Sequence, residues 1–460
     1  MNTKLTCISP IDGSIFAQRD IISREDAVAV ATRAKAAQAD WAARPLRERT
    51  DLVMAGVAAV GAMNDEILIE LAQMMGRPVR YGGEFGGFNE RAGHMAEIAE
   101  SALADIIVSE DEDFKRYIRR IPHGVVLVVA PWNYPYMTAI NTVAPALISG
   151  NTVVLKHATQ TLIVGERMAQ AFYSAGVPRD VFQNVFMDHD TTGALIADRA
   201  FDFVNFTGSV GGGQAMETAA AGTFVGVGTE LGGKDPGYVM DDADVDAAVE
   251  TLIDGAMFNA GQCCCGIERI YVHESHFDTF VAKAVAIVSG YKLGNPLAPE
   301  TTIGPMANVR FAKEVRDQIA EAVEAGATPH IARFAEDDGG AYLTPQILTD
   351  VTHDMRVMQD ESFGPVVGIM KVSTDEEAIT LMNDSEFGLT ASLWSADLAR
   401  AERIGNQLET GTVFMNRADY LDPCLCWTGC KNTGRGGGLS AIGYHNLTRP
   451  KSYHLKKNTG

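Results

Sequence analysis

Short, uninterrupted apolar runs separated by helical stretches constrain the fold of this chain more than any other feature. Residues 124–130 read Gly-Val-Val-Leu-Val-Val-Ala, and residues 151–156 read Asn-Thr-Val-Val-Leu-Lys. An apolar run without polar alternation is typical of a strand that is buried on both faces. A helical pattern at 161–175 and strand patterns at 182–186 and 201–206 follow. This alternation predicts βαβ units and a parallel sheet with helices on both faces.

A second group of elements indicates more than one α/β unit. Helical patterns span 244–258 and 277–289, and a strand pattern covers 269–273 between them. The length of 460 residues exceeds what one hydrophobic core usually supports. We therefore expect two domains in close contact and a small appendage.

The chain before about residue 105 is mainly helical in pattern, and Ser23 is placed to cap its first helix, at 23–40. The stretch 109–120 is highly charged. Its composition fits a solvated loop and an exposed interface strand equally well.

Composition restricts the partners. The formal net charge of −21 disfavours binding to nucleic acid or to an anionic membrane. No apolar run approaches the roughly 20 residues that cross a bilayer, and the N-terminus lacks a signal-peptide pattern, so a cytoplasmic location is expected. Six of the seven cysteines fall at 263–265 and at 424, 426 and 430. In a reducing compartment such clusters indicate catalysis or metal binding.

A glycine-rich loop at 207–213 lies between a predicted strand and a predicted helix. Small residues there let backbone N–H groups and the helix N-terminus approach a phosphate. The glycine spacing is not that of the GxGxxG dinucleotide fingerprint, and a purely structural loop is an equal alternative.

The segment 259–265 reads Asn-Ala-Gly-Gln-Cys-Cys-Cys. A cysteine after a helix and a glycine turn is a plausible nucleophile when its thiolate is stabilised. Three adjacent cysteines cannot all point one way, so Cys263 and Cys265 are interpreted as small buried hydrophobes.

Three polar residues follow predicted strands. Glu230 comes after the apolar run 224–227 and is a candidate general base or a solvated strand end. The amide of Asn133 is placed to donate to an oxyanion or to cap a turn. Lys156 is placed to hold a ribose hydroxyl or a phosphate, or is simply solvated.

Taken in order, these motifs resemble the aldehyde dehydrogenase superfamily over nearly the whole chain, from about residue 8. The matching segments are PWNYP, FTGS, ELGGK, FNAGQCC, ESFGP and GTVFMN. The resemblance implies an NAD(P)-dependent oxidation of an aldehyde to a carboxylic acid through a thioester. It implies Cys264 as the nucleophile, Glu230 as the general base and Asn133 as the oxyanion donor. Retention of Glu230 favours hydrolysis over transfer of the acyl group to coenzyme A.

The resemblance also implies the binding residues for NAD or NADP. The predicted cofactor residues are Trp132, Lys156, Thr159, Gly208, Ser209, Gly213, Glu361 and Phe363. The predicted substrate residues are Tyr134, Thr138, Asn141, Trp427 and Asn416. No metal site is expected.

The resemblance further implies an α/β fold with two doubly wound domains and a small oligomerisation sheet. The cofactor domain is predicted at 1–103 and 123–231, the catalytic domain at 232–439, and the oligomerisation segment at 104–122 and 440–460. In the last of these, residues 448–455 are predicted to form a strand donated to a neighbouring subunit, giving a homodimer or a homotetramer.

Two features depart from the family pattern. Thr159 stands where a carboxylate often binds the adenosine ribose, so NADP is expected to be accepted. The early strand region before Ile8 is expected to be mostly missing. This short N-terminus and the Lys-His-Ala segment at 156–158 resemble the shorter succinate-semialdehyde-type enzymes. A second carboxylate would need a cationic partner, yet residues 133–142 hold no arginine and residues 416–427 hold only Arg417, so none can be placed.

Two other hypotheses belong to different classes. A catalytically silent binding or structural member of the same fold would lack the nucleophile or the base, and both are present. A metal-binding protein would use Cys424, Cys426 and Cys430, but no histidine stands at zinc-finger spacing.

Overall fold

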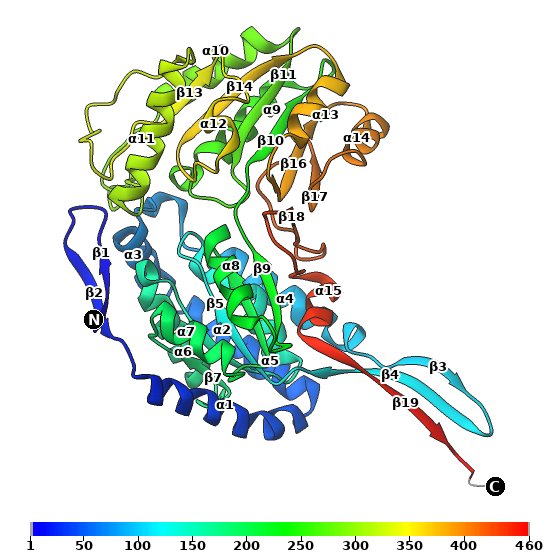
Figure 1. The fold of residues 1–460 in the computed structure, drawn as a ribbon. Helices are drawn as coiled ribbons and strands as arrows, with labels where there is room; N and C mark the ends of the chain where they lie inside the picture. The colour runs from blue at the N-terminus through cyan, green and yellow to red at the C-terminus, as the bar shows by residue number, and fades with distance from the viewer. Residues whose placement is uncertain (1–2, 459–460) are drawn as a thin grey trace.

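The computed structural model describes residues 3–458, which form two α/β units and a projecting arm (Figure 1). The first unit contains a five-stranded sheet of order β7-β6-β5-β8-β9, in which all neighbours are parallel. Its strands are β5 Val125–Val129, β6 Thr152–Lys156, β7 Phe182–Asn184, β8 Phe203–Thr207 and β9 Gly226–Glu230. The predicted parallel sheet is confirmed.

Helices cover both faces of this sheet. Val126 and Val128 of β5 pack in one core with α2, α4, α5 and α6, whereas Val125 and Leu127 pack in another with α1, α7 and α8. Both faces of β5 are therefore apolar, as its sequence predicts. The helices are α1 Arg24–Ala43, α2 Leu46–Gly61, α3 Asn64–Met75, α4 Phe85–Ala102, α5 Pro135–Ile148, α6 Leu162–Ser174, α7 His189–Ala197 and α8 Val210–Ala220. Ser23 caps α1 as predicted, accepting a hydrogen bond from the backbone N–H of Asp26 at 3.0 Å.

The second unit contains a seven-stranded sheet of order β12-β13-β14-β11-β10-β16-β17. Only the β12–β13 pair is antiparallel. Its strands are β10 Asp235–Val239, β11 Ile267–His273, β12 Thr328–Pro329, β13 Gln346–Thr349, β14 Val366–Val372, β16 Thr390–Trp394 and β17 Thr412–Met415. Its helices are α9 Val245–Met257, α10 Phe277–Ser289, α11 Val309–Glu324, α12 Arg356–Gln359, α13 Asp375–Asn383 and α14 Leu398–Gly405.

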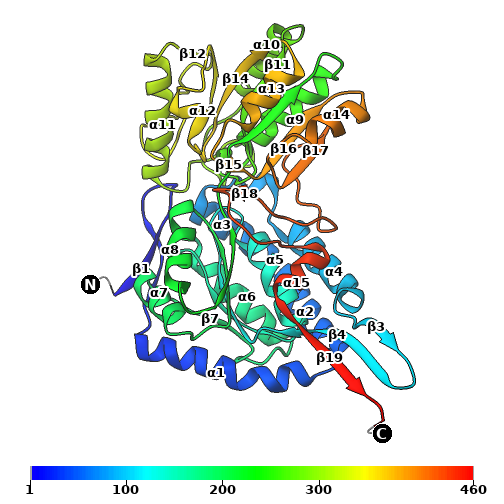
Figure 2. The ribbon, with the colours of Figure 1, turned by 45° about the vertical axis from the view of Figure 1, so that its right-hand side comes forward.

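The arm is a three-stranded antiparallel sheet of order β19-β4-β3 that extends away from both units (Figures 1 and 2). Its strands are β3 Ile106–Glu110, β4 Phe114–Pro122 and β19 Thr448–Lys456. The charged stretch at 109–120 is thus largely a hairpin, and the extended C-terminal strand is confirmed. That strand pairs along its whole length with β4 of its own chain.

The N-terminus corrects one expectation. Strands β1 Lys4–Ile8 and β2 Ile15–Asp20 form an antiparallel hairpin, so the early strand region is present. Its pattern is hidden in the sequence because most of its side chains are exposed or half-buried.

The remaining elements are short. They are β15 Phe387–Gly388, β18 Cys430–Lys431, α15 Ser440–Asn446 and the short 3₁₀ turns Val79–Tyr81, Thr159–Thr161 and Phe258–Gly261. No single helix within 3–458 is long and apolar enough to cross a membrane, although the bent pair α2 and α3 meets that test together on length and composition. The predicted domain limits remain an interpretation, and residues 1, 2, 459 and 460 of those ranges lie outside the described residues.

Candidate active site

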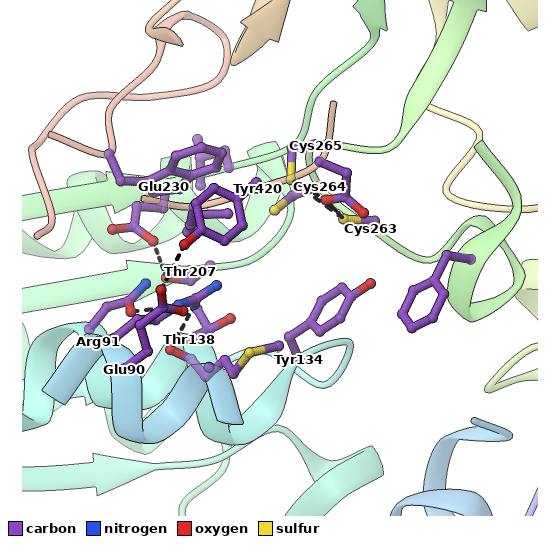
Figure 3. Close-up of a pocket in the computed structure, with 18 residues that line it drawn as sticks. Glu90, Arg91, Tyr134, Thr138, Thr207, Glu230, Cys263, Cys264, Cys265 and Tyr420 are labelled. Carbon is purple, nitrogen blue, oxygen red and sulfur yellow. Dashed lines mark hydrogen bonds between the residues drawn. The ribbon is translucent and has the colours of Figure 1, made fainter. Parts of the chain in front are cut away.

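A cavity of about 340 Å³ lies between the two α/β units (Figure 3). Helices α4 and α5 and strands β8 and β9 supply one side, and residues 258–265 and 419–427 supply the other. Six of the residues predicted from the sequence line it: Tyr134, Thr138, Asn141, Glu230, Cys264 and Trp427. The fold therefore brings together side chains from segments that are far apart in the chain.

A left-handed turn presents Cys264 to this cavity. Asn259, Ala260 and Gly261 have φ values of 55°, 55° and 68°, and a Cβ on Gly261 would stand 2.2 Å from the Gly364 carbonyl oxygen. Only glycine fits this close approach at a positive φ. The Gln262 side chain fixes the turn by accepting from the Ala307 N–H at 2.8 Å.

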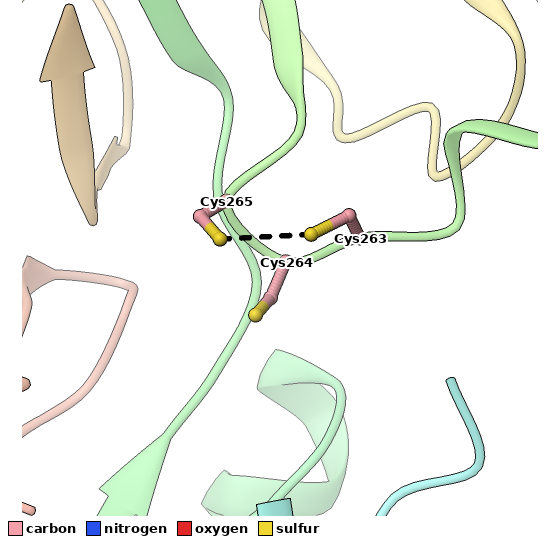
Figure 4. Close-up of side chains that lie close together, drawn as sticks. All are labelled: Cys263, Cys264 and Cys265. Atoms are coloured by element: carbon pink, nitrogen blue, oxygen red, sulfur yellow. Dashed lines mark hydrogen bonds between the residues drawn. The ribbon is translucent and has the colours of Figure 1, made fainter. Parts of the chain in front are cut away.

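The three adjacent thiols diverge, as the sequence predicts. Cys263 and Cys265 are buried, whereas the Cys264 Sγ points to the opposite side (Figure 4). Hydrogen bonding by the Cys263 thiol, and then by the Cys265 thiol, lowers the pKa of Cys264. A lowered pKa increases the thiolate fraction at neutral pH, which suits a nucleophile.

Glu230 is the last residue of β9, and its carboxylate accepts a hydrogen bond from the Thr207 hydroxyl at 3.3 Å. Burial raises the pKa of Glu230 to about 7, while the Thr207 hydrogen bond and the charge of Arg91 partly oppose the rise. A carboxylate that titrates near neutrality suits a general base.

Asn133 lies directly after β5 and is buried. Its backbone carbonyl accepts from Arg77 Nη2 at 2.6 Å and from Asn259 Nδ2 at 3.3 Å. Within 3–458 its side-chain amide has no hydrogen-bond partner, so its N–H groups are available as donors.

A buried ion pair that sequence reasoning missed supports this turn. Arg77 Nη1 lies 2.7 Å from Glu84 Oε1, and both side chains are almost fully buried. The other carboxylate oxygen of Glu84 accepts from the N–H groups of Tyr136 and Met137 at the start of α5. The Arg77 guanidinium also lies over the Tyr134 ring, 4.6 Å from its centroid. One ion pair thus fixes both sides of the turn at Asn133.

Arg91 of α4 is a second residue that the sequence did not reveal. It places a cation at the cavity, which the residues at 133–142 do not. It lines the cavity, and its Nη1 donates to the Met137 carbonyl at 3.1 Å and to Asn141 Oδ1 at 3.4 Å. It forms no ion pair with any residue in 3–458. The available signal was an arginine on the buried face of a helix, between Phe88 and Met95.

The predicted phosphate loop opens α8. Ser209 caps this helix and accepts from the Gly212 N–H at 3.2 Å. Gly213 packs so closely that a Cβ would stand 2.7 Å from the Leu231 side chain. A Cβ on Gly208 would likewise stand 2.8 Å from the Phe206 ring. These glycines allow the close packing of strand, loop and helix N-terminus that a phosphate site uses.

Lys156 ends β6 and is buried, and its ammonium has neither a hydrogen bond nor an ion pair within 3–458. Burial lowers the pKa of Lys156, and the nearby Asp188 partly opposes this. Thr159 begins the 3₁₀ turn that follows β6. An unpartnered buried ammonium is costly unless a ligand pairs with it.

Glu361, Phe363 and Trp132 lie outside the residues that line the cavity. Glu361 accepts from the Gly233 N–H at 2.9 Å, and burial raises its pKa to about 8. Trp132 meets Phe363 edge to face at 5.4 Å between ring centroids.

Two other groups of predicted residues are not brought to the cavity. The Asn416 Nδ2 donates to the Ser395 carbonyl at 2.9 Å, and its Oδ1 accepts from the Ser395 N–H at 3.1 Å. Asn416 does not line the cavity. Cys424, Cys426 and Cys430 do not converge: the one cluster of metal-ligating side chains found within 3–458 is Cys263, Cys264 and Cys265.

Comparisons with known proteins agree with this geometry. The chain is 31% identical over 445 residues to a succinate-semialdehyde dehydrogenase [NADP(+)] of Deinococcus radiodurans, covering 96% of this chain and 93% of that one. It is 32% identical to an aldehyde dehydrogenase of Paenarthrobacter nicotinovorans, covering 97% and 99%. The structure of a succinic semialdehyde dehydrogenase from Streptococcus pyogenes in complex with NADP+ superimposes with a TM-score of 0.93 at 28% identity, covering 98% and 100%. Residues 1–453 match the sequence profile of the Aldehyde dehydrogenase family, and the chain belongs to that family.

Proposed function

We propose that this NAD(P)-dependent aldehyde dehydrogenase oxidises its aldehyde through a thioester on Cys264. The observation that carries the proposal is the shared cavity, which places a thiol of lowered pKa and a carboxylate that titrates near 7 together. The Cys264 thiolate attacks the carbonyl carbon, and the resulting oxyanion accepts hydrogen bonds from the Asn133 amide and the Cys264 N–H. Each such donor is worth about 2.7–4 kcal/mol in the transition state.

Loss of hydride then converts the thiohemiacetal into a thioester, which water hydrolyses. When bound, the nicotinamide accepts that hydride. Glu230 removes a proton from the attacking water, and the Cys264 thiolate leaves as the carboxylic acid forms.

The residues present fit the cofactor. The unpartnered ammonium of Lys156 and the cap of α8 at Ser209 offer donors for a ribose hydroxyl and for phosphates, with Gly208 and Gly213 allowing close approach. Glu361 is placed to bind the second ribose, with Phe363 and Trp132 beside the ring. Thr159 is uncharged and would not repel the 2′-phosphate of NADP. We therefore propose that the enzyme uses both NAD and NADP.

The substrate class follows from Arg91. A buried guanidinium with no carboxylate partner, on the wall of a catalytic cavity, favours an aldehyde that carries its own carboxylate. Relatives named for succinate semialdehyde and for 2-hydroxymuconic semialdehyde fit the same chemistry. Thr138, Asn141, Tyr134 and Trp427 would line the path of its carbon chain, and Asn416 would act only by holding the 415–420 segment.

The test compares succinic semialdehyde with butanal, which has the same carbon number and no carboxylate. We expect kcat/KM to favour the semialdehyde by at least about tenfold, and Arg91→Met to remove that preference while butanal oxidation persists. Equal use of both aldehydes by the unaltered protein would overturn the substrate class. No oxidation of any aldehyde with either cofactor would instead favour the catalytically silent alternative.

Assembly and location complete the proposal. The arm has two edge strands, β3 and β19, and β3 exposes Ile106, Ile107 and Val108. An exposed apolar edge strand is a template for pairing with another chain. A homodimer or a homotetramer would cover it, and analytical ultracentrifugation would measure which one forms. Seven free cysteines fit a reducing, cytoplasmic compartment.

A further inference from the structure

A buried ion pair lies behind Glu361 and Phe363 and has no part in the thioester chemistry. Lys234 Nζ lies 2.5 Å from Glu268 Oε2, and both side chains are almost fully buried. A buried ion pair often stabilises a fold no better than apolar residues of the same volume would. The groups that this pair holds therefore indicate its role.

Glu268 anchors the backbone of the loop at 361–363. Its Oε2 accepts from the Ser362 N–H at 2.8 Å, and its Oε1 accepts from the Phe363 N–H at 2.9 Å. Phe363 has a φ of 48°, in the left-handed region that a bulky residue rarely adopts. Such a conformation persists only where the surroundings hold it, and the Glu268 carboxylate binds the N–H group of this very residue.

The Lys234 ammonium holds the same loop through a side chain. Lys234 Nζ donates to Ser362 Oγ at 3.0 Å, and that hydroxyl donates to Gln318 Oε1 at 2.6 Å. Gln318 lies on α11 and is buried. Residues from three distant segments therefore fix the loop through two backbone N–H groups and one hydroxyl.

The ion pair also joins the segments that carry the base and the nucleophile. Lys234 lies four residues after Glu230, and Glu268 lies four residues after Cys264. These segments lead into β10 and β11, which are parallel neighbours. A Cβ on Gly233 would stand 2.4 Å from the Cys264 carbonyl oxygen, so the two backbones are in direct contact. The pair thus ties the loop that it holds to the backbone of both reacting groups.

We propose that Lys234 and Glu268 are positioning residues for hydride transfer, and that they hold Glu361 and Phe363 at a fixed place relative to Cys264. This role rests on the proposed function, in which Glu361 and Phe363 meet the nicotinamide half of the cofactor. Neither Lys234 nor Glu268 lines the cavity, so both act through the loop. A misplacement of about 1 Å between reacting groups can slow a reaction about 10²-fold.

Equilibrium binding tests this role without turnover. Isothermal titration calorimetry compares NAD with ADP, which carries the adenosine and both phosphates but lacks the nicotinamide riboside. Glu268→Gln is nearly isosteric and turns an amide N–H toward one of the loop N–H groups. We expect it to raise the Kd for NAD at least about threefold and to leave the Kd for ADP unchanged. Ser362→Ala should give the same contrast to a smaller extent.

Kinetics separate hydride transfer from the chemistry of the thiol. The stopped-flow burst of reduced cofactor reports hydride transfer, whereas hydrolysis of p-nitrophenyl acetate by Cys264 and Glu230 needs no cofactor. In Glu268→Gln the burst rate at saturating NAD should fall at least about tenfold, and ester hydrolysis should persist. Deuterium on the aldehyde carbon should slow the remaining burst, because hydride transfer then limits it.

The matched control is Arg400→Met, which breaks the ion pair with Asp375 in the same unit. It should lower stability without changing the ratio of burst rate to ester hydrolysis. Circular dichroism checks each fold. If Glu268→Gln does not fold, the test uses Ser362→Ala and the double variant Lys234→Met, Glu268→Gln, which leaves no unpaired charge.

Two results would overturn the positioning role and leave the proposed function intact. One is an equal loss of hydride transfer and ester hydrolysis in Glu268→Gln. The other is an unchanged burst rate in the folded variant. An unaltered protein that oxidises no aldehyde would overturn the proposed function, and the positioning role with it.

Discussion

Arg77 Nη2 donates to the carbonyl oxygen of Asn133 at 2.6 Å. The same guanidinium pairs with Glu84, which holds the first N–H groups of α5. The proposed oxyanion donor is therefore positioned by a buried ion pair whose two residues do not line the cavity.

Breaking this pair should cost both stability and catalysis. Arg77→Met leaves Glu84 buried and unpaired, which is expected to lower the free energy of unfolding by about 3–5 kcal/mol and to reduce kcat/KM. Urea denaturation and steady-state kinetics measure the two effects. The double variant Arg77→Met, Glu84→Gln should recover part of the stability but not the activity, because Asn133 still lacks its donor. Full activity in a destabilised Arg77→Met would show that the pair is merely structural.

Replacement of the nucleophile should separate the three cysteines. Cys264→Ala should abolish dehydrogenase activity, since no thioester can form. Cys263→Ala and Cys265→Ala should retain most activity at alkaline pH. In both variants the rise of kcat/KM on the acid side of the pH profile should move to higher pH, because loss of either thiol raises the pKa of Cys264. The measurement is kcat/KM against pH for the three variants. A fully active Cys264→Ala would contradict the thioester mechanism.

Loss of the general base should affect the two half-reactions unequally. Glu230→Gln should give a rapid burst of reduced cofactor followed by slow turnover, because hydrolysis of the thioester needs the base while hydride transfer from the adduct needs it less. Stopped-flow absorbance resolves the two phases. If burst and steady state fall together, Glu230 acts on the thiol instead, and if neither falls, it is not the base.

The pH dependence of turnover should report the same carboxylate. Where hydrolysis limits, kcat should rise with pH through about 7, because only the deprotonated Glu230 accepts a proton from water. Arg91→Met should move this midpoint upward with butanal as substrate, because the charge of Arg91 lowers the pKa of Glu230. If Arg91→Met leaves the midpoint unchanged, the charge of Arg91 does not affect the titration of Glu230.

Cofactor choice should depend on Thr159. We expect kcat/KM for NAD and NADP to differ by no more than about two decades, or about 2.7 kcal/mol. Thr159→Glu should cut NADP use sharply, because its carboxylate would repel the 2′-phosphate, and should leave NAD use similar or better. Measuring both cofactors on both proteins decides the point: an unchanged preference in the variant would assign cofactor choice to another residue.

The contrast between what the sequence predicts and what it misses is physical. Strand β5 is recognisable because five consecutive buried side chains leave a local signature. The catalytic candidates are recognisable because they lie in short motifs. Arg91 and Asp419 belong to no such motif. Only the packing of α4 against α5, and of the 419–427 loop against the cysteine segment, brings them to the cavity. The hairpin of β1 and β2 is not predicted because, unlike β5, its partly solvated strands carry little apolar pattern.

The pairing of β4 with β19 has a consequence for biosynthesis. Arg120 on β4 and its hydrogen-bond partner Thr448 on β19 are 328 residues apart. The central strand of the arm therefore leaves the ribosome with one edge unpaired and stays so until the final residues are translated. A chain that stops early, or loses its tail to a protease, carries an open strand edge on an exposed arm, where a chaperone or a degradation enzyme can recognise it as unfinished.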